Sequence, residues 1–130
     1  MIGTLGREIV FEVSDETVMT ISELSRTVSG RWAVHETSDV KPRPEFLGPG
    51  LQGVSLSIHL SAMLGVKPRA VIEAVEKKVE NGDAEYLVLG TAPVSANPFR
   101  ITESSEAWNA IYHRGELVKA DLTLTLEEYV

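Results

Sequence analysis

Cysteine is absent from the 130 residues of this sequence. Its absence excludes disulfide-stapled scaffolds, thiolate zinc sites, iron–sulfur clusters and cysteine nucleophiles. Basic side chains are also scarce, because 12 Lys and Arg stand against 19 Asp and Glu, which gives a formal net charge of −7. Nucleic-acid affinity is supplied mainly by Lys and Arg that neutralise phosphates. We therefore expect no specific nucleic-acid binding by this chain.

Long apolar runs are missing as well. No uninterrupted stretch approaches the roughly 20 apolar residues that a membrane-spanning helix needs. The first residues show neither a charged leader before an apolar run nor a glycine directly after Met1. We expect a soluble, unprocessed protein that makes no membrane contact. With 43% hydrophobic and 24% charged residues, the composition is typical of a globular protein, and the length predicts one domain over residues 1–130.

The dominant pattern that the sequence does contain is alternation with a period of two. Between Val54 and Ser61 every second residue is apolar, which indicates a half-buried strand with Ser and His side chains on its polar face. The same alternation runs from Val118 to Glu127. The segment 18–28 permits an opening helical turn, but we favour a strand there. Further strands are predicted at 9–13, 31–35, 86–89, 99–102 and 108–112, and residues 113–116 are expected to join the last of these to the carboxy-terminal strand as a hairpin.

One segment has helical periodicity. Pro68 suits a first helical turn, apolar residues from Val71 to Val79 recur at helical spacing, and Asn81-Gly82 follows as a stop signal. We therefore predict an α+β fold that is mainly β: an antiparallel β-sandwich or open barrel with one flanking helix at about residues 68–80. A doubly wound fold is disfavoured, because one helix cannot supply the repeated crossovers that parallel strands need.

None of the sequence motifs indicates an active site. Residues 48–53 satisfy the pattern G-x-G-x-x-G, but a strand follows them and Pro49 occupies the second position, so we interpret them as a tight turn. His35, His59 and His113 lack metal-ligand spacing. No G-x-S-x-G nucleophile elbow is present. We expect no enzyme activity, no catalytic or metal-binding residue and no cofactor.

The segment from Lys41 to Gly50 is dense in proline and glycine. Pro42 and Pro44 predict a loop, because proline prevents regular helix and central-strand pairing. From the residues alone we favour a rigid connector between strands. The alternative is a pre-organised docking arm that binds a partner with little ordering cost. Just upstream, we expect Trp32 to lie in the core and Arg31 to be available to an interface.

Five segments stand in one order along the chain. They are a Met-x-Gly-x-Leu-Gly start, the triplet Arg31-Trp32-Ala33, the segment Lys41–Gly50 with its Phe-Leu-Gly-Pro-Gly element, the alternating strand from Val54, and the ending Leu-Thr-Leu-Thr-Leu-Glu-Glu-Tyr at 122–129. Together they resemble the GpU family of phage tail proteins over nearly the whole chain. The Phe-Leu-Gly-Pro-Gly element is the most specific part of this resemblance.

The resemblance implies a structural protein of contractile phage tails, or of phage-tail-like bacteriocins, that is required for tail assembly. It implies a tail-tube-like fold and a six-fold ring of copies near the junction of the tail tube and the baseplate hub. Its partners would be further copies of itself and the tube and hub proteins. The protein would be assembled in the bacterial cytoplasm and reside in the virion tail or tail-like particle. The family has no catalytic residues to carry over.

Under this resemblance the segment Lys41–Gly50 becomes a candidate contact in the ring or with the tube, beside its interpretation as a connector. Two alternatives to the hub-proximal ring stay open: a monomeric β-barrel binding domain, and a tail-terminator ring at the opposite end of the tube. The acidic excess adds the hypothesis that part of it faces the lumen of the ring, where like charge repels passing DNA. The candidate assembly-interface residues are Arg31, Trp32, Lys41, Pro42, Arg43, Pro44, Glu45, Phe46, Leu47, Gly48, Pro49 and Gly50.

Overall fold

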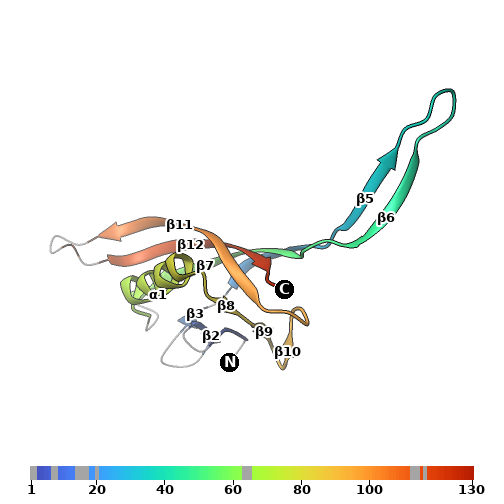
Figure 1. Cartoon of the computed structure of the whole chain (residues 1–130). Coiled ribbons are helices and arrows are strands. Elements are labelled where there is room, and N and C mark those ends of the chain that lie inside the picture. The colour runs from blue at the N-terminus through green and yellow to red at the C-terminus, as the bar shows by residue number, and fades with distance from the viewer. Residues whose placement is uncertain are drawn as a thin grey trace.

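The computed structural model describes residues 3–6, 9–13, 18–19, 21–62, 66–111, 115 and 117–130. They form a body of two five-stranded sheets and one helix, from which a two-stranded ribbon projects far outward (Figure 1). Every strand pairing found in these residues is antiparallel. The predicted mainly β fold with one flanking helix is therefore confirmed. No helix in this part of the chain is both long and apolar enough to cross a membrane.

The main sheet is built on the long strands whose alternation the sequence shows. Its strand order is β4 (Ile21–Thr27), β7 (Gly53–Ser61), β12 (Leu117–Glu128), β11 (Phe99–Ile111) and β8 (Ala84–Glu85). Strands β7 and β12 pair from Gly53 opposite Glu127 to Ser61 opposite Lys119, which confirms both predicted strands. The sheet curls into a half-barrel (Figure 1).

The hydrophobic core lies between the main sheet and a smaller sheet. Alternation buries Leu56 and Ile58 of β7 together with Leu122 and Leu124 of β12, and each such side chain stabilises the fold by about 1.5–3 kcal/mol relative to an exposed position. The smaller sheet closes the core from the other side with Phe11 and other buried apolar residues. Its strand order is β10 (Ala92–Pro93), β9 (Leu87–Leu89), β1 (Gly3–Leu5), β2 (Ile9–Val13) and β3 (Val18–Met19).

The helix α1 (Pro68–Asn81) confirms the prediction for residues 68–80. Proline stands in its first turn, and Gly82 ends it in the left-handed conformation with φ of 69°, where its N–H bonds the carbonyls of Lys78 and Val79. Ile72 and Val75 bring the apolar face of the helix into the core. Helix α1 therefore covers the core side of the main sheet and leaves the other side of that sheet open.

Three predicted strands have different boundaries in the structure. The segments predicted at 99–102 and 108–112 belong to the single strand β11, which pairs with β12 through three register shifts between Ile101 and Ile111. These irregularities interrupt the period-two pattern, so the sequence does not indicate the middle of the strand. The segment 18–28 divides into β3 and β4, which lie in different sheets. Tyr112 and all of the predicted connection 113–116 except Gly115 lie outside the described residues.

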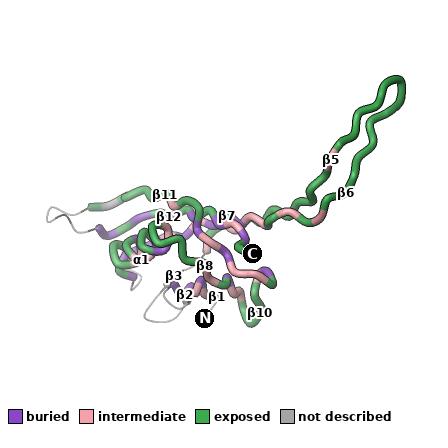
Figure 2. The backbone as a smooth tube through the Cα atoms, viewed as in Figure 1, coloured by how far each residue is buried: buried purple, intermediate pink, exposed green. Residues whose placement is uncertain are grey.

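The projecting ribbon corrects the prediction that Lys41–Gly50 is a loop. Strands β5 (Gly30–His35) and β6 (Arg43–Pro49) pair with each other and with no other described strand. Proline excludes central-strand pairing, but in a two-stranded ribbon both strands are edge strands, so Pro44 is accommodated opposite Val34. Trp32 was expected in the core and is instead exposed on this ribbon, which is exposed along nearly its whole length (Figure 2).

Candidate assembly surfaces

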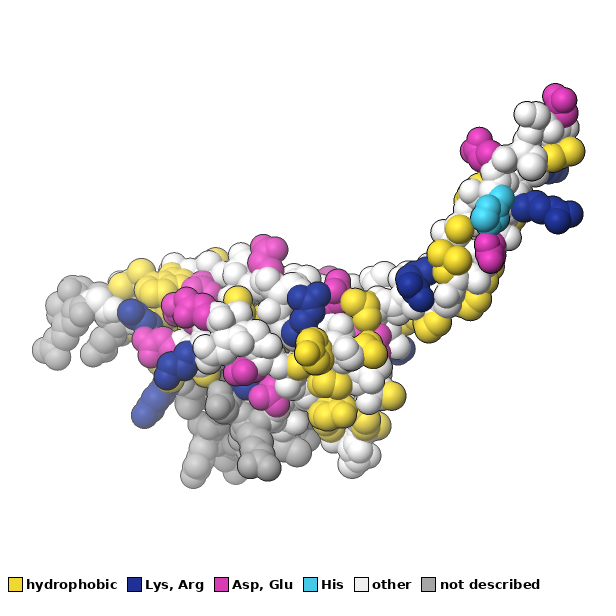
Figure 3. Space-filling view, viewed as in Figure 1, with side chains coloured by type: hydrophobic (Ala, Val, Ile, Leu, Met, Phe, Trp, Pro, Cys, Tyr) yellow, Lys and Arg dark blue, Asp and Glu magenta, His cyan; other side chains and the backbone are white. Residues whose placement is uncertain are grey.

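The ribbon of residues 30–49, called the arm below, has two chemically different faces. Cross-strand partners share a face of a ribbon, and Trp32 lies opposite Phe46 while Val34 lies opposite Pro44. These four side chains form the apolar face of the arm. Residues at the intervening positions, among them His35, form a more polar face, on which His35 Nε2 lies 2.6 Å from the Glu45 Oε2. Figure 3 shows hydrophobic and charged side chains side by side along the arm.

The apolar face is held together by one aromatic contact and is otherwise open to solvent. The rings of Trp32 and Phe46 meet edge to face with centroids 5.0 Å apart. Even so, Trp32 is 59% exposed and Phe46 is 57% exposed. An isolated two-stranded hairpin is marginally stable in water at best, and exposed contiguous apolar surface marks interaction sites. The arm thus carries apolar surface that the described part of the chain leaves uncovered.

Arg31 forms hydrogen bonds across a β-bulge near the base of the arm. The ladder shifts register between Arg31 and Trp32, which leaves Leu47 without a cross-strand partner as a β-bulge. Arg31 Nε donates to the carbonyl of Pro49 at 3.2 Å and its Nη2 donates to the carbonyl of Leu47 at 3.3 Å. Gly48 has φ of 128°, in the region that favours glycine. Arg31 and Gly48 therefore determine the geometry of the bulge.

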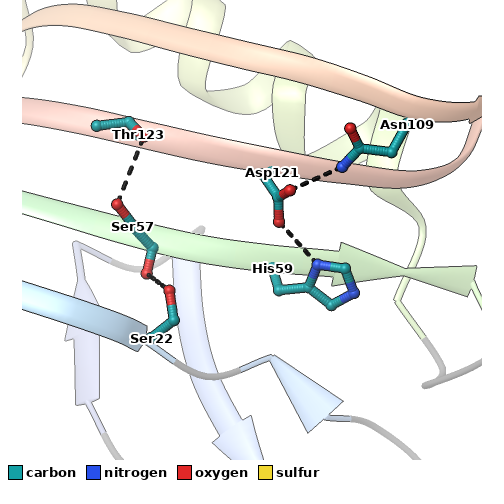
Figure 4. Close-up of polar contacts among 6 residues, drawn as sticks. All are labelled: Ser22, Ser57, His59, Asn109, Asp121 and Thr123. Atoms are coloured by element: carbon teal, nitrogen blue, oxygen red, sulfur yellow. Dashed lines mark hydrogen bonds and ion pairs between the residues drawn. The ribbon is translucent and has the colours of Figure 1, made fainter.

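The side of the main sheet away from α1, called the polar face below, is covered by short polar side chains. Ser57 Oγ lies 3.4 Å from Thr123 Oγ1, and His59 Nδ1 lies 2.8 Å from Asp121 Oδ1 (Figure 4). Asn109 Nδ2 donates to the other oxygen of Asp121 at 2.7 Å. Hydrogen bonds from His59 and then from Asn109 hold the pKa of Asp121 below its ordinary value of 3.8. The placement of His59 on a polar strand face is confirmed.

Both edges of the main sheet present unpaired backbone in the described residues. Strand β4 pairs with β7 on one side and with no described strand on the other. Strand β11 meets β8 only at Phe99 and Arg100, so the backbone from Ile101 to Ile111 pairs with no described strand on that side. Unpaired strand edges are templates for pairing with another chain. The sheet can therefore extend at either edge.

The structure brings the predicted interface residues together in the arm. Arg31 and Trp32 lie in β5, residues 43–49 lie in β6, Lys41 and Pro42 precede β6, and Gly50 follows it at the base of the arm. Sequence reasoning did not identify the contacts of Asp121 with His59 and Asn109, because the sequence does not show which strands are neighbours or in what register they pair. No group of three or more His, Cys, Asp or Glu side chains suited to a metal occurs among the described residues.

The chain is similar to one family of proteins and to solved structures. The family model described as phage P2 GpU matches residues 7–130. No curated protein matches the chain. Among solved structures, a chain described as the tail of an empty GTA particle, obtained with helical refinement and C6 symmetry, is 17% identical with a TM-score of 0.48, over 85% of this chain and 78% of that one.

Proposed function

This chain belongs to the phage P2 GpU family, a family of phage tail structural proteins, and from that membership we propose that it forms a six-fold ring in a contractile tail or tail-like particle. The ring lies at or near the junction of the tail tube and the baseplate hub. Its partners are further copies of the chain and the tube and hub proteins. Its role is structural, without catalysis or cofactor. The particle is assembled in the bacterial cytoplasm.

The observation that carries the proposal is the arm with its uncovered apolar face. Trp32, Val34, Pro44 and Phe46 lie on one side of a ribbon that contributes no residue to the described core. A ribbon of this kind gains its stability when a partner covers the apolar face, and aromatic side chains are frequent anchors at such contacts. We assign the residues 31–32 and 41–50 to this contact, with Arg31 acting through the shape of the bulge.

The two open edges of the main sheet supply a way to close a ring. Pairing of the β4 edge of one copy with the β11 edge of the next is a contact between two different surfaces, and repeated contacts of this type form a ring when their rotation closes. In such a ring the polar face turns toward the central channel, with Asp121 among its acidic groups.

Self-assembly separates this proposal from the monomeric binding domain. We expect negative-stain images of the purified full chain to show rings or stacked tubes, and light scattering at several concentrations to report a mass that rises with concentration. A chain that remains a monomer at every concentration, including in the presence of the parent tail-tube protein, contradicts ring formation. Rings located at the tube end away from the hub in labelled particles support the terminator alternative instead.

The arm contact is tested by truncating its aromatic anchors in the parent particle. We expect Trp32→Ala or Phe46→Ala to reduce the number of intact tails roughly tenfold or more, since removing a buried interface anchor costs about 2 kcal/mol or more. Circular dichroism of the isolated chain should still report a folded body, because neither side chain belongs to the buried core. The matched control is Tyr86→Ala, which removes an aromatic of similar exposure from the body. Normal tail numbers from both arm variants return the arm to the connector interpretation.

A further inference from the structure

The carboxylate of Glu128 is buried, and both of its oxygens accept hydrogen bonds. Glu128 is the last residue of β12 and is only 7% exposed. Its Oε1 accepts the backbone N–H of Gln52 at 3.0 Å. Its Oε2 accepts the hydroxyl of Ser95 at 2.7 Å and the amide of Asn97 at 3.0 Å. None of the three donors belongs to the buried apolar core.

Gln52, the first of these donors, lies at the base of the arm. It stands between the end of β6 and the start of β7, and Glu128 holds it twice, because the Glu128 N–H also donates to the Gln52 carbonyl at 2.9 Å. Arg26 Nε fixes the side chain of the same residue by donating to Gln52 Oε1 at 3.1 Å. Beyond the chain connections to β4 and β7, Gln52 therefore attaches the base of the arm to the end of β12 and to Arg26 of β4.

Packing contributes little to holding the arm at its base. A hollow of about 630 Å³ lies there, lined by residues of the arm base and of the carboxy-terminus. Its apolar lining residues Val28, Leu51 and Val130 are exposed. One further backbone bond, from the Gly50 N–H to the Ser29 carbonyl at 2.8 Å, joins the two strands of the arm to each other but not to the rest of the body. The direction of the arm thus depends on polar contacts.

We propose that Glu128 is a positioning residue, which sets the direction in which the arm leaves the body by holding Gln52 against the end of β12. The proposal rests on the proposed function, in which the arm reaches a partner, and it assigns to Glu128 the orientation of that contact surface. Pre-organisation of this kind lowers the ordering cost of association. The charge of the group suits the role, since a carboxylate accepts from all three donors at once.

The test measures arm direction in the isolated chain, so that it does not depend on tail assembly. Because the chain has no cysteine, a spin label is introduced at Ser38→Cys near the tip of the arm and a second at Glu76→Cys on the exposed side of α1. A second pair, Glu23→Cys with Glu76→Cys, reports on the body alone. Pulsed electron–electron double resonance then gives the distribution of distances between the two spin labels of each pair.

We expect Glu128→Gln to widen the arm-to-body distribution roughly twofold and to leave the body pair unchanged, as for local loosening of one segment. The glutamine side chain keeps the shape but presents an amide nitrogen to groups that are themselves donors. The matched control is Glu127→Gln, which alters the neighbouring side chain that accepts a bond from Arg100 on the polar face. It should change neither distribution.

An unchanged arm-to-body distribution in folded Glu128→Gln overturns the proposal, and so does equal widening of both pairs, which assigns Glu128 to the stability of the whole body. If Glu128→Gln does not fold, Asn97→Ala removes a single donor, and a smaller widening confined to the arm pair is then expected. Failure of the proposed ring would show in the assembly experiments above, while these distances would remain as expected.

Discussion

Gly82 shows how a single residue determines an end of an element. It adopts φ of 69° after the last turn of α1, and a β-carbon added to it would meet no heavy atom within 4 Å beyond its chain neighbours. The space for a larger residue is therefore available, and only the backbone conformation opposes it. A β-carbon in this conformation is unfavourable because it approaches the following carbonyl oxygen.

We expect Gly82→Ala to lower the free energy of unfolding by about 1 kcal/mol, the cost of a left-handed conformation for a residue with a β-carbon. Gly82→Asn should cost less, because asparagine tolerates this conformation better. Urea unfolding of both variants beside the parent chain measures the difference. Equal loss in the two variants would contradict a backbone origin.

Glu128 also predicts a pH dependence. The N–H of Gln52, and then Ser95 and Asn97, hold the pKa of Glu128 below its ordinary value of 4.5. A lowered pKa in the folded chain means that the ionised group stabilises the fold above the ordinary value, and that this stabilisation is lost as the pH falls through the folded-state pKa.

The difference in unfolding free energy between the parent chain and Glu128→Gln should therefore be constant near neutral pH and shrink as the pH is lowered below 4.5. Urea unfolding across a pH series measures it. A difference that grows on acidification would show that the folded-state pKa of Glu128 is raised.

At the scale of the element, successive side chains of β12 alternate between the core and the polar face. Leu124 is fully buried in the core beside its cross-strand neighbour Leu56, while Thr123 lies on the polar face. We expect Leu124→Ala to cost about 2–5 kcal/mol, from lost burial and the cavity left behind. Thr123→Ala should change stability by about 0.5 kcal/mol or less. Thermal and urea unfolding of the pair measure both effects, and similar costs would mean that the assigned faces are wrong.

Elements with regular periodicity were predictable from the sequence, and irregular ones were not. The strands β7 and β12 and the helix α1 follow one period from end to end, so their residues alone indicate them. Strand β11 contains register shifts that interrupt its period, and Gly3–Leu5 is too short for a period to be visible. Element length and regularity therefore decided which strands could be recognised.

The candidate site divides in the same way. The density of proline and glycine drew attention to Lys41–Gly50, but the same prolines favoured a loop, because the sequence does not reveal that β6 has only one neighbour. Trp32 was assigned to the core because a large apolar residue is most often buried. The contacts of Glu128 join segments 31 to 76 positions apart, and no local pattern indicates them.

At the scale of the whole molecule, chemical labelling can test which face of the main sheet lines the channel of the proposed ring. In assembled tails, a cysteine at Ser57 on the polar face should react with a small maleimide but be protected from one attached to a large polymer. A cysteine at Glu76 on α1, on the other side of the sheet, should not be protected from the large reagent by the channel. Mass spectrometry of labelled tails measures both. Free reaction of Ser57→Cys with the large reagent would place the polar face outside the channel.

The continuity between the arm and the main sheet has a mechanical consequence. The chain passes from β4 into β5 and from β6 back into β7, so the arm prolongs two paired strands of the body. Ladder hydrogen bonds lie perpendicular to the strands. A pull applied along one strand of the arm therefore acts to slide β4 past β7. The hydrogen bonds between these strands, from Thr27 opposite Gly53 to Ile21 opposite Ile58, then bear the force together in shear. They do not open one after another.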